Sequence, residues 1–199
     1  SITTGDYNVG LGDSALTATT TGVSNVALGY QALLDNTEGD YNTAIGRGAL
    51  ANNTTADFNV AIGGFTLETC TTGASNTAVG YQSMNYVTTG GNNTSVGYYA
   101  LRANTTGNYN NAFGIEALKT NTTGSNNIAI GRLAMAQNTT GGTNVSIGEE
   151  ALEQNTTGDA NVAVGYRALE ANTTADYNVA MGYKALFANT TGYSNVAVG

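Results

Sequence analysis

Few side chains in this sequence could do chemistry. The sequence has no His, and Cys70 is its only cysteine, so neither a histidine acid–base group nor a cysteine zinc cluster can form. Cys70 has no basic residue near it in sequence, so nothing would activate its thiol. We therefore expect no enzymatic activity and no cofactor.

Carboxylates are the remaining candidates for metal binding. Asp40 and Asp57 are 17 residues apart, as are Asp159 and Asp176. In a stacked structure each pair would lie about 5 Å apart, close enough to share a calcium ion. The glycine–aspartate nonapeptides of calcium-binding solenoids are absent. These four residues are the candidate metal ligands, but we favour exposed, solvated loop acids as their explanation. The glutamates within 149–170 similarly fit a solvated face.

Aromatic side chains recur at the same spacing and could bind a host-surface glycan by stacking on sugar rings. The five that share one register are Tyr30, Tyr81, Tyr98, Tyr166 and Tyr183. Packing against the coil edge would explain the same column, and we favour it. Repeated Thr suggests an ice-binding surface, but its two Thr columns are adjacent in sequence and would point to opposite faces of a strand.

Composition excludes several partners. The formal net charge is −8 with only 6 Lys and Arg, which is the wrong sign and density for holding nucleic acid. No apolar run of about 18 residues is present, so we expect no membrane insertion. The absence of Pro suits a chain whose backbone is hydrogen-bonded along its whole length.

An internal repeat of 17 residues organises the whole sequence. Asn recurs at every seventeenth position from 8 to 195, and we number the repeat from this Asn as position 1. Position 3 is small, position 4 is large and apolar, position 5 is Gly, position 9 is Leu or Met, and position 13 is Thr. Such uniformity indicates identical stacked units. We expect one repeat domain over 1–199 that begins and ends inside a repeat and belongs to a longer fibre.

A 17-residue unit is shorter than helical or leucine-rich repeats and suits one coil of a parallel β-solenoid. Positions 2–4 alternate like a strand, position 5 allows a sharp bend, and positions 12–15 form a turn. Positions 6–11 stay open between a helical turn, which 149–154 would favour, and strand or irregular chain. The expected fold is all-β, with about 11.7 coils.

Stacking assigns a role to each invariant column. Asn at position 1 and Thr at position 13 should form hydrogen-bonded ladders, as at Asn25, Asn42, Asn59, Asn127, Thr54, Thr105 and Thr122. Positions 4 and 9 should fill the core, as at Ile45, Leu50, Ile62, Leu67, Ile130 and Leu152. Glycine at position 5 should form the bend, as at Gly29, Gly46 and Gly131.

The motifs Asn-Val-Ala-Leu-Gly (25–29) and Asn-Ile-Ala-Ile-Gly (127–131) resemble the head repeats of trimeric autotransporter adhesins. The longer unit, as in 29–37, resembles repeats of bacteriophage tail fibres. This resemblance covers the whole chain and implies a left-handed parallel β-roll assembled as a homotrimer. The period departs from autotransporter heads, whose repeat is usually shorter. Two large apolar side chains per coil also bury little surface for one thin rod, which favours an oligomer.

We therefore expect a structural segment of an extracellular fibre, on a virion or a bacterial cell surface. A phage tail fibre that acts in host attachment is the first interpretation. A bacterial trimeric adhesin or self-assembling surface filament is the second. A solenoid that binds glycan, calcium or ice is the unrelated alternative.

Overall fold

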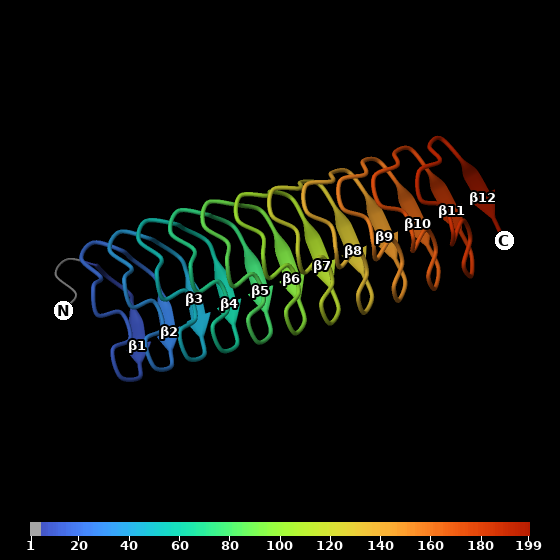
Figure 1. Cartoon of the computed structure of the whole chain (residues 1–199). Helices are drawn as coiled ribbons and strands as arrows, with labels where there is room; N and C mark the ends of the chain where they lie inside the picture. The colour runs from blue at the N-terminus through green and yellow to red at the C-terminus, as the bar shows by residue number, and fades with distance from the viewer. Residues whose placement is uncertain (1–4) are drawn as a thin grey trace.

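The computed structural model describes residues 5–199 as one uninterrupted stack of coils (Figure 1). Its twelve strands form a single parallel sheet in sequence order, and each residue pairs with the one 17 positions later, as Val162 does with Val179. The strands are Val9–Leu11 (β1), Val26–Leu28 (β2), Thr43–Ile45 (β3), Val60–Ile62 (β4), Thr77–Val79 (β5), Thr94–Val96 (β6), Asn111–Phe113 (β7), Ile128–Ile130 (β8), Val145–Ile147 (β9), Val162–Val164 (β10), Val179–Met181 (β11) and Val196–Val198 (β12). The predicted parallel β-solenoid of 17-residue coils is confirmed.

Outside the strands, each coil consists of turns. Positions 6–11, left open by the sequence, contain no helix in any coil that the structure describes. Their backbone is left-handed at positions 7 and 9, and the Leu and Met residues of position 9 have φ between 50° and 54°. This conformation is costly for a bulky side chain, so the contacts between coils must hold it in place. Within 5–199 no helix is long and apolar enough to cross a membrane.

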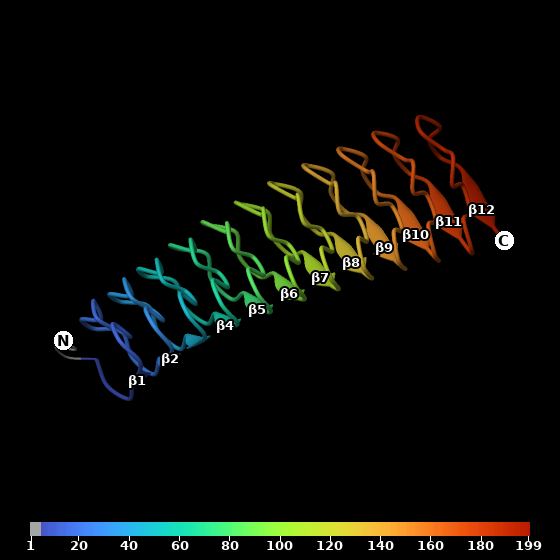
Figure 2. The same ribbon diagram turned by 60° about the horizontal axis from the view of Figure 1, so that its bottom comes forward.

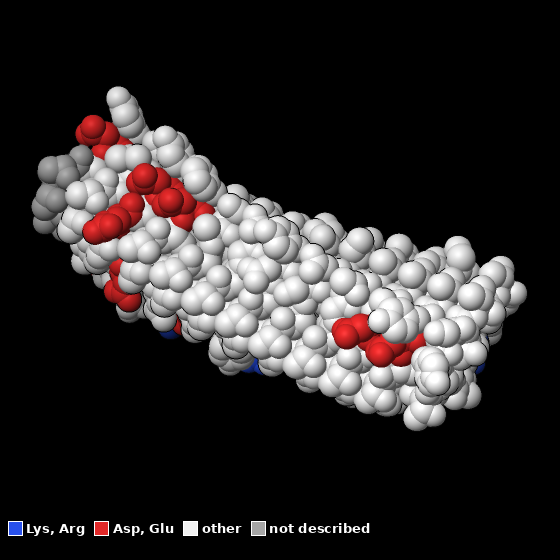
Figure 3. Space-filling model, turned by 90° about the horizontal axis from the view of Figure 1, so that it is seen from above, with Lys and Arg blue, Asp and Glu red and all other residues white. Residues whose placement is uncertain are grey.

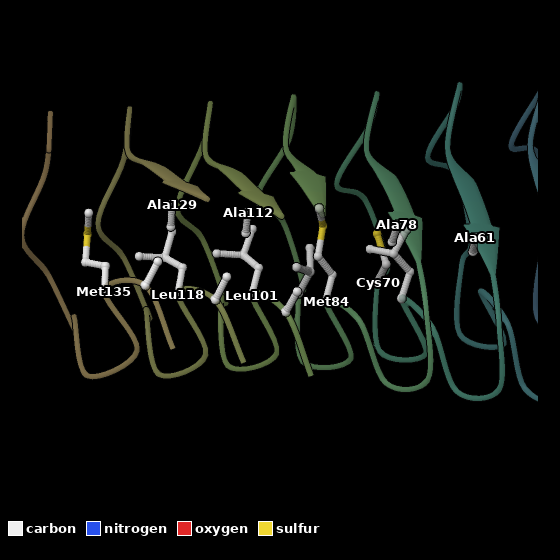
Figure 4. Close-up of a cluster of buried hydrophobic side chains, with 14 of the residues drawn as sticks. Ala61, Cys70, Ala78, Met84, Leu101, Ala112, Leu118, Ala129 and Met135 are labelled. Carbon is white, nitrogen blue, oxygen red and sulfur yellow. The ribbon is translucent and has the colours of Figure 1, made fainter. Parts of the chain in front are cut away.

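The interior of the rod is a thin hydrophobic column. Leu or Met at position 9 lies fully buried in nearly every coil and faces the small residues of positions 3 and 8, as Leu101 and Leu118 do beside Ala112 and Ala129 (Figure 4). Only Ala or Ser fits at position 3 in the central coils, because the opposite wall of the coil lies so close. Leu50, Leu67 and Leu152 therefore lie in the core.

The expectation that position 4 also fills the core is wrong. Ile62 and Ile130 are 37% and 40% exposed, and Ile45 is only half-buried. In a three-residue strand, successive side chains point to opposite faces, so an inward position 3 turns positions 2 and 4 outward. The rod in Figure 2 accordingly carries its strands along one side, with the turns behind them.

Buried asparagines connect each coil to the next. At position 1, Asn42 donates its backbone N–H to Oδ1 of Asn25 over 2.9 Å, and its own Oδ1 accepts from Asn59 over 3.0 Å. Asn127 repeats this contact with Asn110. The side-chain amide of Asn42 also donates to the carbonyl of Ala56 in the same coil, which closes that coil. Each Asn therefore satisfies its buried polar groups within and between coils.

Two further columns extend this network. At position 13 the Thr hydroxyls from Thr20 to Thr156 donate to the Thr carbonyl of the following coil, over 3.2 Å from Thr54, 3.0 Å from Thr105 and 3.0 Å from Thr122. At position 12 a second asparagine ladder, not predicted from the sequence, links Asn121 to Asn104 over 2.8 Å. The amides at both Asn columns are buried, so these bonds are protected from water.

The glycine at position 5 is required by the close approach of neighbouring coils. Gly131 has φ 134°, and a Cβ built on it would lie 2.5 Å from the carbonyl oxygen of Gly148. Gly29 and Gly46 occupy the same bend. A side chain at this position would meet both backbone strain and a backbone clash.

Candidate functional site

The outer side of the sheet is an accessible, mainly apolar surface that runs along the rod. We define the outer face as positions 2 and 4 of strands β1–β12. Within it the large apolar residues of position 4 are from 37% exposed at Ile62 to 44% exposed at Met181 in seven of the ten interior strands, and half-buried in the other three, at Ile45, Val79 and Val164. The position 2 side chains are half-buried over most of the length. A contiguous exposed apolar strip of this kind is typical of a protein–protein contact.

The outer face carries no charge. All residues at positions 2 and 4 are apolar, Thr or Asn, whereas every Lys, Arg, Asp and Glu lies at another repeat position. Its polar members are Thr43, Thr77, Thr94 and Asn111, all at position 2. Their side chains make no hydrogen bond within the part of the chain that the structure describes. These groups are free to bond across an interface.

The edge that follows the strands carries all the basic residues and most of the aromatic ones. Arg47 lies 5.6 Å from the ring centre of Tyr30, and Lys184 lies 5.3 Å from that of Tyr183. Tyr166 and Tyr183 stack at 5.5 Å. The Arg47–Tyr30 and Tyr166–Tyr183 contacts join neighbouring coils, whereas Lys184 and Tyr183 lie in one coil. Each cation–π contact is worth roughly 0.5–1 kcal/mol at an exposed site. The contacts between coils stabilise the stack along this edge.

The same contacts weaken the proposed sugar-stacking role of the tyrosines. Tyr81 stacks on Tyr98 at 5.9 Å, and Tyr98 stacks on Tyr99 at 3.9 Å. The Tyr98 hydroxyl donates a hydrogen bond to that of its neighbour Tyr99, which raises the pKa of Tyr98. Because a sugar packs on the flat face of a ring, neighbours that already cover such faces compete with it. Glycan binding at Tyr30, Tyr81, Tyr98, Tyr166 and Tyr183 stays a prediction.

The opposite edge contains the candidate metal ligands at position 16, where the structure gives them backbone partners. Oδ1 of Asp57 accepts the backbone N–H of Asp40 over 2.7 Å, and Oδ1 of Asp40 accepts that of Val23 over 2.7 Å. Asp176 and Asp159 repeat this pattern. In Figure 3 the acidic atoms gather toward the two ends of the face drawn, with a stretch without acidic atoms between.

These bonds give the column a structural role, since neutral Asn108 accepts the same N–H from Gly91. Over residues 5–199, no group of three or more His, Cys, Asp or Glu is arranged to hold a metal ion. Calcium binding at this column therefore stays a prediction without a described site.

The glutamates of 149–170 form a charge network with two arginines. Arg132 contacts Glu149 at 2.6 Å and Glu150 at 2.7 Å, while Arg167 bridges Glu150 and Glu170. Glu153 lies beside them, and its pKa is raised, first by burial and then by repulsion from Glu150 and Glu170. The ion pairs link neighbouring coils. Within this network, no two carboxylates are left without a basic partner.

Cys70 marks a gap in the position 12 ladder. Its thiol is fully buried and donates to the carbonyl of Gly73 over 3.2 Å, and burial raises its pKa to about 12. Val87 occupies the next coil, so Asn53 and Asn104 have no amide between them. Oδ1 of Asn53 is consequently buried without a hydrogen-bond partner. A thiol this protonated is not a nucleophile, and Cys70 acts as a small core residue.

Comparison with known proteins adds no assignment: no protein-family model, no curated protein and no solved structure matches the chain. The surface itself must therefore carry the functional argument.

Sequence reasoning missed the outer face, although the signal was present. Alternation along three residues requires position 4 to point away from an inward position 3. Uniformly small residues (Ala, Ser or Gly) at position 3 indicate a narrow interior, and uniformly large apolar residues at position 4 indicate a second contact surface.

Proposed function

We propose that this chain is a structural segment of an extracellular fibre, and that three parallel copies associate through their outer faces. The observation that carries the proposal is the uncharged, mainly apolar outer face, which runs from β1 to β12. A phage tail fibre that acts in host attachment is the context we favour, because the repeat resembles those fibres. The protein would then act outside the cell, on a virion.

The shape of the face favours copies of the same chain as its partner. Twelve strands at about 4.8 Å and three residues at about 3.3 Å give a strip about 50 Å long and about 10 Å wide. The flat area of this strip is roughly 500 Å², without the added area of protruding side chains. A standard protein–protein interface buries about 800 Å² per partner. A partner must present a surface as long, straight and uncharged as the outer face itself, and a parallel copy meets all three requirements.

The interior of the rod suits mechanical rather than chemical work. Every coil is joined to its neighbours by strand pairing, by the position 1 asparagines and by the position 13 threonines. A load along the axis is shared among these parallel bonds. The described residues also lack a histidine or a reactive thiol for catalysis.

Charge placed on the outer face tests the proposal directly. Sedimentation or mass photometry of the 199-residue chain should give three copies. Ile62→Asp combined with Ile130→Asp should dissociate them, because carboxylates would be buried without partners. Ile115→Asp is the matched control: Ile115 is 52% exposed but lies at position 6, outside the face. A wild-type monomer with full β circular dichroism, or equal dissociation by the control, would refute the proposal.

A further inference from the structure

One of the four polar residues of the outer face differs from the others. Asn111 in β7 is the only amide on that face, and its strand also carries the only aromatic residue there, Phe113. The neighbours of Asn111 at position 2 are Thr94 on one side and Ile128 on the other. Its side chain points outward, because Ala112 beside it is fully buried. It has no side-chain hydrogen bond within residues 5–199.

The polar residues of position 2 follow a pattern that does not repeat. Thr occurs in β3, β5 and β6 and Asn in β7, while all the other strands have Val or Ile. If three parallel chains meet at this column in register, each polar side chain faces its own kind. A slip by one coil would place Asn111 of one chain against Ile128 of another. A buried amide without a partner is strongly unfavourable, whereas paired amides satisfy one another.

We infer that Asn111 sets the register in which copies of this chain associate, by pairing with its equivalents across the outer faces. The inference rests on the trimer proposed above. A single buried Asn fixes register in coiled coils by the same physics, at some cost in stability. Phe113 reinforces it, since a slip would move this large ring beside Val96 or Ile130 of another chain.

Disulfide cross-linking can read the register. Val145→Cys and Val162→Cys place thiols at position 2 of β9 and β10, away from Asn111. A disulfide requires Cα atoms closer than about 7 Å, and one coil of slip adds about 4.8 Å along the axis. We would mix an untagged Val145→Cys chain with a Val162→Cys chain carrying a fusion tag, refold the mixture together and oxidise it. A disulfide between two chains that carry the same cysteine then reports the correct register. A disulfide between a tagged and an untagged chain, which gives a product of mixed size, reports a slip of one coil.

With Asn111 present, the cross-links should join only equal chains. With Asn111→Val in both chains, the mixed-size product should rise about tenfold, which corresponds to about 1.4 kcal/mol. The melting temperature of the assembly should not fall, because a buried polar group has been removed. Asn52→Val is the matched control, since Asn52 is an exposed amide at position 11, outside the outer face.

The outcomes separate the two proposals. A trimer in which Asn111→Val leaves the mixed-size product unchanged overturns the register role and leaves the fibre proposal intact. A trimer that forms neither kind of cross-link shows that position 2 does not lie at the interface, which also overturns the register role. A monomer by mass photometry overturns the trimer and the register role together.

Discussion

The gap in the position 12 ladder can be closed by two substitutions, Cys70→Asn and Val87→Asn. In the present chain, Oδ1 of Asn53 is buried without a partner, and Asn104 has no amide before it. Elsewhere in the column, each amide up to Asn172 donates to the Oδ1 of the preceding coil over 2.7 to 2.9 Å, as between Asn138 and Asn121, and the last bond, from Asn189, is 3.5 Å. The double substitution should extend this ladder across both coils.

The single substitutions should not achieve this. Cys70→Asn supplies a donor to Asn53, but its own new oxygen would face Val87, so the unpaired group only moves by one coil. We expect a change within about 1 kcal/mol of zero. Val87→Asn loses a fully buried apolar side chain and leaves Asn53 unpaired, so it should cost about 1–2 kcal/mol.

The double variant alone gains the bond between the two new amides and leaves no buried oxygen unpaired. The favourable coupling energy should therefore be about 1–3 kcal/mol. At about 2–4 °C per kcal/mol for a chain of this size, thermal melting followed by circular dichroism can resolve it. Hydrogen exchange should show the added protection in β4–β6. The four proteins must be compared at one concentration, because assembly also contributes to stability.

A second double-mutant cycle, with Cys70→Ala and Val87→Ala, is the control. It removes both side chains without adding amides, so it should show little coupling. If the asparagine cycle shows no coupling, or an unfavourable one, the ladder does not carry the stability that we assign to it.

Four further outcomes test other parts of the structure. Gly131→Val should cost more than about 4 kcal/mol in a denaturation series, and a wild-type melting curve would contradict the tight bend. Asp57→Asn should change stability by less than about 0.5 kcal/mol because an oxygen still accepts from Asp40, whereas Asp57→Ala should lose about 1 kcal/mol; equal effects would exclude this hydrogen-bonding role. The raised pKa of Glu153 means that the folded state binds its proton more tightly, so this group adds stability as pH falls through that pKa. Glu153→Gln should accordingly raise the melting temperature at pH 7, by less than about 1 kcal/mol in equivalent stability, and should flatten its pH dependence between pH 4 and 7. Cys70 should resist a thiol reagent at pH 8 until the chain unfolds, and rapid labelling of the folded rod would show that its site is open.

The sequence was sufficient to predict the coil and its direction of stacking. A strict 17-residue period with Asn, Gly and Thr at fixed positions admits few folds, and the parallel register follows from it. Which apolar column faces inward could not be read from hydrophobicity alone. Leu50 and Ile62 are equally apolar, yet one is buried and the other exposed. Their difference arises from strand alternation and from the narrowness of the coil.

Two other features depended on the backbone. The left-handed backbone conformation of Leu50, with φ 50°, could not be predicted from the sequence, because Leu normally avoids this conformation. The Asn residues at position 12, which form the second ladder, predict only a turn from the sequence, because Asn favours turns in any fold. The outer face could be recognised as a site only after position 3 had been assigned to the interior of the coil and positions 2 and 4 to its surface.

The two asparagine ladders have a direction. Asn42 donates to Asn25, and Asn121 donates to Asn104, so each amide points back toward the coil that precedes it. A finished coil consequently presents carbonyl oxygens toward the part of the chain that comes after it. A ribosome releases the amino-terminal coils first, so every new coil meets a row of acceptors already in place. Synthesis and stacking can thus proceed in the same direction, each coil serving as the template for the next.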